Sequence, residues 1–263
     1  MQSFQYHRPS SLSEALSLLG SGEGSLLAGG QSLIPAMKHD LAAPLSLVSL
    51  RDVSELSGIQ SGKSGVTIGA MTTHAEVAAS PEVQSAIPAL AHLAGDIGDP
   101  QVRHRGTIGG SVAHADPAAD YPAALLGLGA TVVTSAREIA ADDFFTGMFS
   151  TALEPGEIIT AVRFPVPECA AYAKFASPAS KYAIVGVMVS KGAGGVRVAV
   201  TGASPSVFRQ AAMEAALASN FSAAALGGTA QSADGLVTDL EASAEYRAHL
   251  VGVMARRAVE SCR

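Results

Sequence analysis

Two short glycine segments constrain this chain more than any other feature of its sequence. One is Thr-Ile-Gly-Gly-Ser at residues 107–111, and His114, Asp116 and Asp120 follow it closely. Glycine has no Cβ, so backbone N–H groups at such a turn approach a ligand closely and converge on an anion. The carboxylates behind the turn are acceptors for sugar hydroxyls. The segment therefore indicates a nucleotide site, although a tight structural turn with solvated polar residues is an equally good interpretation of this segment alone.

The other segment is Ala-Gly-Gly-Gln-Ser at residues 28–32. It follows the apolar run Leu26–Ala28, which predicts a buried strand, and precedes residues 33–38, which predict a helical turn with a proline near its start. Free N–H groups and the helix dipole at such a junction favour a phosphate. A strand–turn–helix junction without a ligand would look similar, but two such segments in one chain favour the nucleotide site.

Residues 58–64, Gly-Ile-Gln-Ser-Gly-Lys-Ser, resemble a phosphate-binding loop but do not qualify as one. Three residues separate the glycines where the P-loop requires four, and a strand follows in place of a helix. The pattern instead predicts a hairpin with strands over 56–60 and 66–70 and a turn at 61–65.

The rest of the chain alternates helices and strands. Capping boxes at Ser11–Glu14 and Thr73–Glu76 predict the starts of two helices, and the first of these helices ends before the glycine-rich loop 20–25. The proline-rich segment Pro165-Val166-Pro167 predicts a boundary between domains 1–167 and 168–263. Further helices are expected over 82–95, kinked or divided at Pro88, and over 118–128, 208–218 and 243–260, and strands over 45–50, 130–134, 157–164, 172–175, 181–189 and 196–201. The expected core face of the last helix is Tyr246, Leu250, Val253, Met254 and Ala258.

Composition argues against several classes of protein. The net charge of −6 and the lack of a basic patch with interleaved aromatics argue against a nucleic-acid binder. No run of about 18 apolar residues is present, and the first residues lack the plan of a signal peptide, so a soluble cytoplasmic protein is expected. Cys169 and Cys262 are far apart in the sequence and have no metal-ligand spacing, so we expect no iron–sulfur cluster in this chain.

The side chains of His114, Asp116 and Asp120 are of types that bind metal ions, but Pro117 follows Asp116 and no fourth ligand has a suitable spacing. We therefore expect no metal here. No nucleophile with a partner base can be argued from spacing. The adjacent carboxylates Asp142 and Asp143 should point apart into solvent. The remaining histidines are interpreted as surface or cap residues: His39, His74, His92 and His104.

The two glycine segments, with a series of shorter motifs, resemble the FAD-binding medium subunits of the molybdenum hydroxylases, the xanthine dehydrogenase and carbon monoxide dehydrogenase family. The likeness is greatest to the carbon monoxide dehydrogenase flavoprotein type and extends over nearly the whole chain. The motifs keep their order and approximate spacing: FxYHRP (4–9), AGGQSL (28–33), IPxMK (34–38), LRD (50–52), IGAMTT (68–73), DPQ (99–101), TIGGSVAHADPAAD (107–120), EPGE (154–157) and EYR (245–247).

The resemblance implies an α+β fold, with a two-subdomain PCMH-type FAD-binding domain followed by a small domain of three antiparallel strands and helices. The FAD pyrophosphate would lie between the glycine segments and Asp120 near the ribose and adenine, while Lys174 would approach the flavin ring and Tyr182 would lie over it. The cofactor-binding residues that it implies are Ala28, Gly29, Gly30, Gln31, Ser32, Leu33, Thr107, Gly109, Gly110, Ser111, His114, Asp116, Asp120, Lys174 and Tyr182.

This sequence departs from the family pattern at three positions. Gln31 replaces a frequent histidine and Ser111 a frequent asparagine, and both keep hydrogen-bonding capacity. Lys181 stands where relatives often carry aspartate, so the charge beside the flavin differs.

The implied function is electron transfer. A large subunit with molybdopterin cytosine dinucleotide would oxidise the substrate, and a small subunit with two [2Fe-2S] clusters would reduce non-covalent FAD in this chain, which passes electrons to an external acceptor. The assembly would be a cytoplasmic dimer of heterotrimers. The substrate, chosen in another chain, stays open between carbon monoxide, an N-heterocycle and an aldehyde.

Two alternatives are kept. One is a self-contained FAD oxidase of vanillyl-alcohol-oxidase-like architecture, although the roughly 96 residues after Pro167 are few for its substrate-capping domain. The other is a nucleotide-binding subunit without turnover, which a colourless purified chain would favour.

Overall fold

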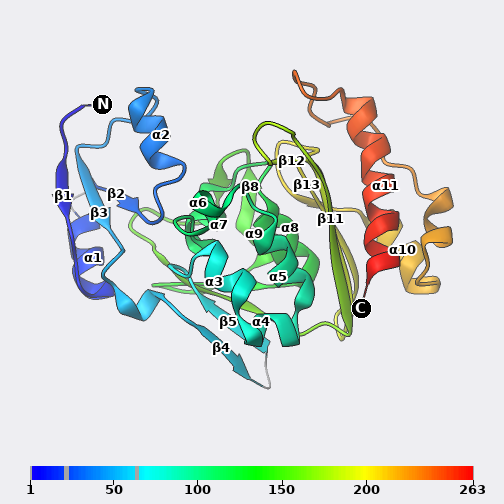
Figure 1. Ribbon diagram of the computed structural model, residues 1–263, viewed down its shortest axis with the longest axis horizontal. Helices are drawn as coiled ribbons and strands as arrows, with labels where there is room; N and C mark the ends of the chain where they lie inside the picture. The colour runs from blue at the N-terminus through cyan, green and yellow to red at the C-terminus, as the bar shows by residue number, and fades with distance from the viewer. Residues whose placement is uncertain (1, 21–23, 63–64, 263) are drawn as a thin grey trace.

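The computed structural model describes residues 2–20, 24–62 and 65–262, so the expected turn at 61–65 and loop at 20–25 lie partly outside the described residues. Three main sheets follow one another along the long axis of the molecule (Figure 1). A small N-terminal sheet lies at one end, a five-stranded sheet with a layer of helices lies in the middle, and the C-terminal sheet with its long helix lies at the other end.

The N-terminal sheet is parallel, in the order β1 (Gln5–His7), β3 (Ser46–Ser49), β2 (Gly24–Leu27). Helix α1 (Leu12–Leu19) connects β1 to β2, and α2 (Leu33–Lys38) follows β2 as expected. The Ser11 hydroxyl accepts from the Glu14 N–H, as the capping box predicts. The Glu14 carboxylate, however, accepts from the N–H of Ser10.

The middle sheet is antiparallel, and it contains the predicted hairpin of β4 and β5. Its strand order is β4 (Ile59–Gly62), β5 (Gly65–Gly69), β10 (Ile159–Phe164), β6 (Thr131–Thr134) and β7 (Glu138–Ala140). Strand β10 begins two residues later than expected, because residues 154–157 form a turn closed by the Glu157 N–H on the Glu154 carbonyl.

A layer of short helices packs against this sheet, and prolines divide it. The predicted helix over 82–95 is two helices, because the residue before Pro88 has a non-helical ψ of 72°. The capping box at Thr73 is confirmed. The helices of this region are α3 (His74–Ala79), α4 (Pro81–Ala86), α5 (Pro88–Gly95), α6 (Pro100–Arg103), α7 (Ile108–His114), α8 (Asp120–Leu128) and α9 (Ala141–Phe144). The short helix η1 (Ser54–Leu56) precedes β4 and packs Leu56 into the N-terminal core, and β8 (Phe145–Gly147) and β9 (Ser150–Thr151) form a small hairpin.

The C-terminal sheet contains the three predicted antiparallel strands, β11 (Cys169–Ala176), β12 (Ala183–Gly192) and β13 (Gly195–Thr201), and a two-residue edge strand, β14 (Phe208–Arg209). Alternate residues of β12 face opposite layers: Met188 packs into the core with α8, whereas its neighbours Val187 and Val189 pack under the last helix. That helix is α11 (Ala244–Ser261), and it covers the outer face with α10 (Ala211–Ser219) and η2 (Ala223–Gly228) (Figure 1).

Three sequence expectations need correction here. Leu250, Met254 and Ala258 of α11 are buried as expected, but Tyr246 is 45% exposed and Val253 only partly buried. Asp142 is not merely solvated, because it accepts two hydrogen bonds from Arg197 of β13, at 3.0 and 2.9 Å. Cys169 and Cys262, treated above as separate because they are far apart in the sequence, are neighbours in the fold, with their Sγ atoms 3.0 Å apart.

Within the described residues, no helix combines the length and apolar character that crossing a bilayer requires.

Candidate functional site

A cavity of about 640 Å³ opens where the N-terminal unit, the helices α7 and α8 and the loop before β12 meet. All of the residues that the sequence implicates, apart from Lys174, line it. They are Ala28, Gly29, Gly30, Gln31, Ser32, Leu33, Thr107, Gly109, Gly110, Ser111, His114, Asp116, Asp120 and Tyr182. Residues as far apart in the sequence as Ala28 and Tyr182 therefore converge on one space.

The first glycine segment gives the cavity a set of free backbone donors. The N–H groups of Gly30, Gln31, Ser32 and Leu33 donate no hydrogen bond to any residue that the structure describes. Gly30 has φ of +76°, which L-amino acids with a side chain rarely adopt. The N–H groups at this turn are therefore available to an anion.

The two glycine segments touch each other. A Cβ on Gly29 would lie 2.0 Å from the carbonyl oxygen of Arg105, and one on Gly110 would lie 3.4 Å from the Cβ of Ala28. Because the first of these contacts is with backbone, any side chain at Gly29 would push the segments apart.

The second glycine segment differs from the sequence expectation. The N–H groups of Ile108 and Gly109 already donate to the carbonyls of Thr72 and Ala70, at 3.1 and 2.8 Å. The N–H of Gly110 donates to the Thr107 hydroxyl at 3.2 Å, where Thr107 caps α7. The first two donors hold the turn against the residues that follow β5, the third closes the cap of α7, and none is free for an anion. The segment instead presents a side-chain-free surface and the Ser111 hydroxyl to the cavity.

Asp120 lies at the cavity wall in a buried polar cluster. Its carboxylate, 4% exposed, accepts from the Tyr172 hydroxyl at 2.5 Å and lies 3.2 Å from Nζ of Lys174. Burial raises the pKa of Asp120 to about 6, although the Lys174 charge and the Tyr172 hydrogen bond act in the opposite direction. The carboxylate is therefore held by strand β11.

Lys174 lies behind this wall and does not line the cavity. Its side chain is 2% exposed, and Nζ donates to the backbone carbonyls of Asp96 and Lys181 at 2.8 and 3.1 Å as well as to Asp120. An ammonium group has three donors, so these acceptors satisfy it. In this structure Lys174 orders the wall, whereas the resemblance implies that it approaches a flavin.

The rim of the cavity carries exposed groups. Tyr182 is 43% exposed, and the preceding Lys181 has φ of +64°. The His114 ring lies 5.1 Å from the ring of Phe149.

Sequence reasoning missed His74, which it interpreted as a surface or cap residue. His74 begins α3 but is 5% exposed and lines the cavity, and its Nδ1 has no hydrogen-bond partner among the described residues. Burial, helped by the Arg103 charge, lowers its pKa to about 4, so the imidazole is neutral at pH 7. The sequence carried no local signal for this, because the residue that leaves room for the ring is Gly106, 32 positions later, where a Cβ would lie 2.5 Å from Nε2 of His74.

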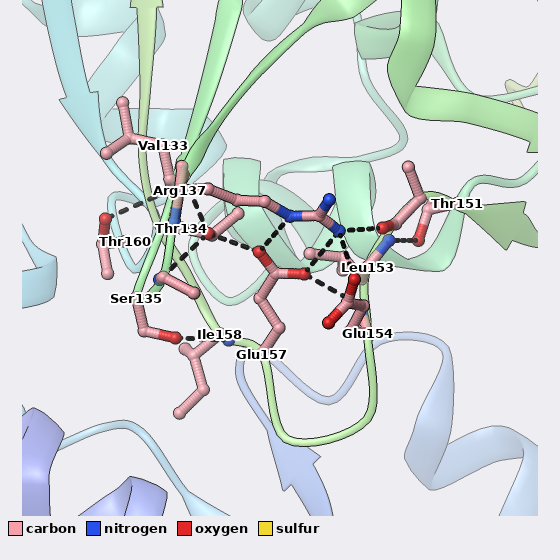
Figure 2. Close-up of polar contacts among 12 residues, drawn as sticks. Val133, Thr134, Ser135, Arg137, Thr151, Leu153, Glu154, Glu157, Ile158 and Thr160 are labelled. Carbon is pink, nitrogen blue, oxygen red and sulfur yellow. Dashed lines mark hydrogen bonds and ion pairs between the residues drawn. The ribbon is translucent and has the colours of Figure 1, made fainter.

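The loop before β10 supplies another part of the wall that the sequence did not indicate. Figure 2 shows Arg137 reaching across to Glu157, with Nε to Oε1 at 3.1 Å, while Thr134 donates to the same oxygen at 2.6 Å. The hydrogen bond from Arg137, with those from Thr134 and the Glu154 N–H, lowers the pKa of Glu157 to about 2. The loop is thus fixed with Ile158 in the cavity lining.

No group of three or more His, Cys, Asp or Glu side chains in the described ranges is placed to hold a metal ion.

Comparisons by sequence and by structure match this chain to the same group of proteins. Residues 2–167 match the family described as FAD binding domain in molybdopterin dehydrogenase. The chain is 39% identical to the carbon monoxide dehydrogenase medium chain of Afipia carboxidovorans, covering 98% of this chain and 96% of that one. It is 36% identical to the nicotine 6-hydroxylase medium subunit of Paenarthrobacter nicotinovorans, over 98% and 97%. Among solved structures, reconstituted CO dehydrogenase from Oligotropha carboxidovorans matches with a TM-score of 0.91 and 36% identity, over 98% and 97%.

Proposed function

Because the chain belongs to the family of FAD-binding domains in molybdopterin dehydrogenases, we infer that the cavity between its two glycine segments holds FAD. The chain is the FAD-carrying, electron-transferring subunit of a multi-subunit oxidoreductase of the molybdenum hydroxylase type. The observation that carries the site assignment is the convergence of residues 28–33, 107–120 and 182 on one cavity.

The residues present fit a dinucleotide. The free N–H groups from Gly30 to Leu33 suit a pyrophosphate, and the lack of a Cβ at Gly29 lets this segment pack beside Arg105, which precedes the second segment. Asp116 and Asp120 are acceptors on the cavity wall for ribose hydroxyls. FAD supplies the electron-accepting and electron-donating chemistry when bound, and the chain supplies binding, orientation and electrostatics.

Three roles within the site are part of this proposal. The segment 28–33 supplies most of the pyrophosphate donors, because the N–H groups of residues 108–110 are engaged. Tyr182, at the rim, lies over the isoalloxazine ring. Lys174 acts from behind the wall, where it fixes the orientation of Asp120 and the carbonyl of Lys181.

The molybdenum centre and the iron–sulfur clusters belong to partner subunits. The relatives are medium chains, which are parts of enzymes with larger and smaller subunits. We propose a cytoplasmic dimer of heterotrimers in which residues 1–167 form the FAD-binding domain and 168–263 the C-terminal domain. The alternative of a self-contained oxidase loses support, because the chain aligns over almost its whole length with medium chains.

The electron-transfer function is tested on the isolated FAD-loaded chain under anaerobic conditions. Dithionite should bleach the flavin, whereas carbon monoxide, N-heterocycles and aldehydes should not. Addition of the large and small subunits from the same organism should make bleaching depend on one of these substrates. Rapid bleaching of the isolated chain by such a substrate would favour the self-contained oxidase, and a colourless folded chain would refute FAD binding.

A further inference from the structure

The only two cysteines of the chain come together at the outer end of the C-terminal sheet. Cys169 is the first residue of β11, and Cys262 follows the last residue of α11, 93 positions later. Their Sγ atoms lie 3.0 Å apart, and both residues are partly exposed. In Figure 1 the C-terminal end of α11 lies beside this end of the sheet.

We propose that Cys169 and Cys262 are a covalent modification site, at which a small disulfide oxidant converts the two thiols into an intramolecular disulfide. A disulfide has its sulfurs about 2.05 Å apart, so the pair needs to close by only about 1 Å. Neither residue lies within a helix, and Cys262 has the extended backbone angles φ −66° and ψ 120°. The approach therefore requires no rearrangement of α11. This proposal is independent of the proposed function.

The chemistry needs an oxidant, and glutathione disulfide is the class that we specify. The thiolate of one cysteine attacks a sulfur of glutathione disulfide, forming a mixed disulfide and releasing one glutathione thiolate. The second cysteine, as its thiolate, then attacks the protein sulfur of the mixed disulfide and releases the second glutathione. Two protein thiols lose two electrons and two protons, and one glutathione disulfide becomes two glutathione molecules.

The surroundings of the two cysteines affect the reactivity of the thiols and the stability that a disulfide would add. Burial, with the neighbouring Cys169 sulfur, raises the pKa of the Cys262 thiol, so this sulfur is protonated at neutral pH and reacts faster as the pH rises. The link would close a loop of the chain that contains the whole C-terminal sheet, which restricts the unfolded chain. It would also tether α11 to the strand that carries Tyr172 and Lys174.

The test uses FAD-loaded full-length chain treated with glutathione disulfide, alkylated under denaturing conditions and digested with trypsin without reduction. Cys169 lies in the peptide 164–174 and Cys262 in the peptide 258–263. We expect these peptides joined, with a mass lower by two hydrogens than their sum, at a yield independent of protein concentration. Separate alkylated or glutathionylated peptides, or joining only between two chains, would overturn the proposal.

The Cys169→Ser and Cys262→Ser variants are the matched controls. Each should stop at a mixed glutathione disulfide, because the resolving thiol is gone. Oxidation should raise the thermal midpoint of the wild-type chain by about 5 °C or more and leave the variants unchanged. A wild-type midpoint that does not rise, although the peptides are joined, would overturn the inferred tether of α11.

Discussion

The hydroxyl of Tyr172 donates a 2.5 Å hydrogen bond to Oδ1 of Asp120, and this contact joins the C-terminal sheet to the first residue of α8. Gly186 on the adjacent strand makes room for it, because a Cβ there would lie 2.2 Å from the tyrosine oxygen. Lys174 lies two residues further along β11 and therefore reaches the same carboxylate from the same face. The acid at the cavity wall is positioned by a strand more than fifty residues away.

Lys174→Met should destabilise the chain strongly, by about 3–5 kcal/mol, because it leaves Asp120 as an uncompensated buried charge. The loss should be smaller at low pH. Asp120 has a folded-state pKa of about 6, above its unfolded value of 3.8, so its contribution to stability is full below pH 3.8 and is lost as the pH rises through 6. Removal of the lysine raises that pKa further. Urea unfolding at about pH 5 and pH 8 measures the difference.

The matched controls for this variant are Tyr172→Phe and Lys191→Met. The first removes one buried hydrogen bond and should cost about 1–3 kcal/mol. The second breaks only the exposed ion pair with Glu168 and should cost less than about 1 kcal/mol. Equal effects for Lys174→Met and Lys191→Met would contradict the buried cluster.

His74 should make the chain sensitive to acid. Its folded-state pKa of about 4 lies below the unfolded value of 6.5, so its contribution is full above pH 6.5 and is lost as the pH falls through 4. Between about pH 7.5 and 4.5 this amounts to about 2–3 kcal/mol. The variant His74→Phe, which cannot titrate, should lose that much less stability on acidification.

This comparison is made by urea unfolding of both proteins without flavin. Asp120 titrates in the opposite sense, but it is present in both proteins and cancels in the difference between them. Parallel pH profiles would show that His74 is not buried in its neutral form.

The two glycine segments could be predicted from the sequence because glycine and its flanking apolar run are local signals. Helix α2 has the predicted bounds, the strand before it lies over residues 24–27 where 26–28 was predicted, and the hairpin of β4 and β5 is confirmed. Pro88 was visible in the sequence, but whether it kinks or divides a helix depends on the conformation of Ile87.

The rest depends on contacts between distant positions, for which local patterns carry no signal. The N–H groups of Ile108 and Gly109 look free until the carbonyls of Thr72 and Ala70 are placed against them. Lys174 lies 54 positions from Asp120, and Cys169 lies 93 from Cys262. Their separations in the sequence give no indication that they meet.

Gly30→Val should abolish FAD retention in a folded chain. The residue has φ of +76°, and its Cβ would lie 2.6 Å from the Ile34 side chain, so the donors of residues 30–33 would be displaced. Gly156→Val is the matched control, because Gly156 has φ of +82°, open space around its Cβ position and no place in the cavity lining. Flavin absorbance per chain after gel filtration gives the occupancy. Similar occupancy in both variants would refute the assignment of the first segment.

Gly109→Val should instead prevent folding. A Cβ there would lie 2.5–2.9 Å from Ala70, including its backbone, so the turn could not pack against the residues that follow β5. Thr107→Ala should keep the fold, lose about 1 kcal/mol with the cap of α7, and bind FAD more weakly. Circular dichroism reports folding, and flavin absorbance reports occupancy. A folded Gly109→Val chain with full FAD would contradict the first expectation, and full FAD occupancy in Thr107→Ala would contradict the second.

FAD should be bound without a covalent link. Neither cysteine lines the cavity, and the backbone donors of residues 30–33 provide a non-covalent site. Acid precipitation should release the yellow colour into the supernatant. Flavin retained in the washed pellet would point to attachment through a cavity histidine, His74 or His114.

Lys181→Gly should remove the positive charge of this rim residue and keep its backbone carbonyl. The backbone at 181 has φ of +64°, so glycine removes a strain of roughly 1 kcal/mol while the carbonyl that accepts from Lys174 stays in place. The positive charge at the cavity rim is lost. Because reduction adds negative charge to the flavin, the midpoint potential of bound FAD should fall by about 10–20 mV, the shift expected for a partly solvated charge.

Lys181→Arg should leave the potential unchanged, and Lys181→Asp should lower it about twice as far as Lys181→Gly does. Dye-equilibration titration under nitrogen measures all three, and one potential shared by the glycine, arginine and aspartate variants would place the flavin ring away from this rim.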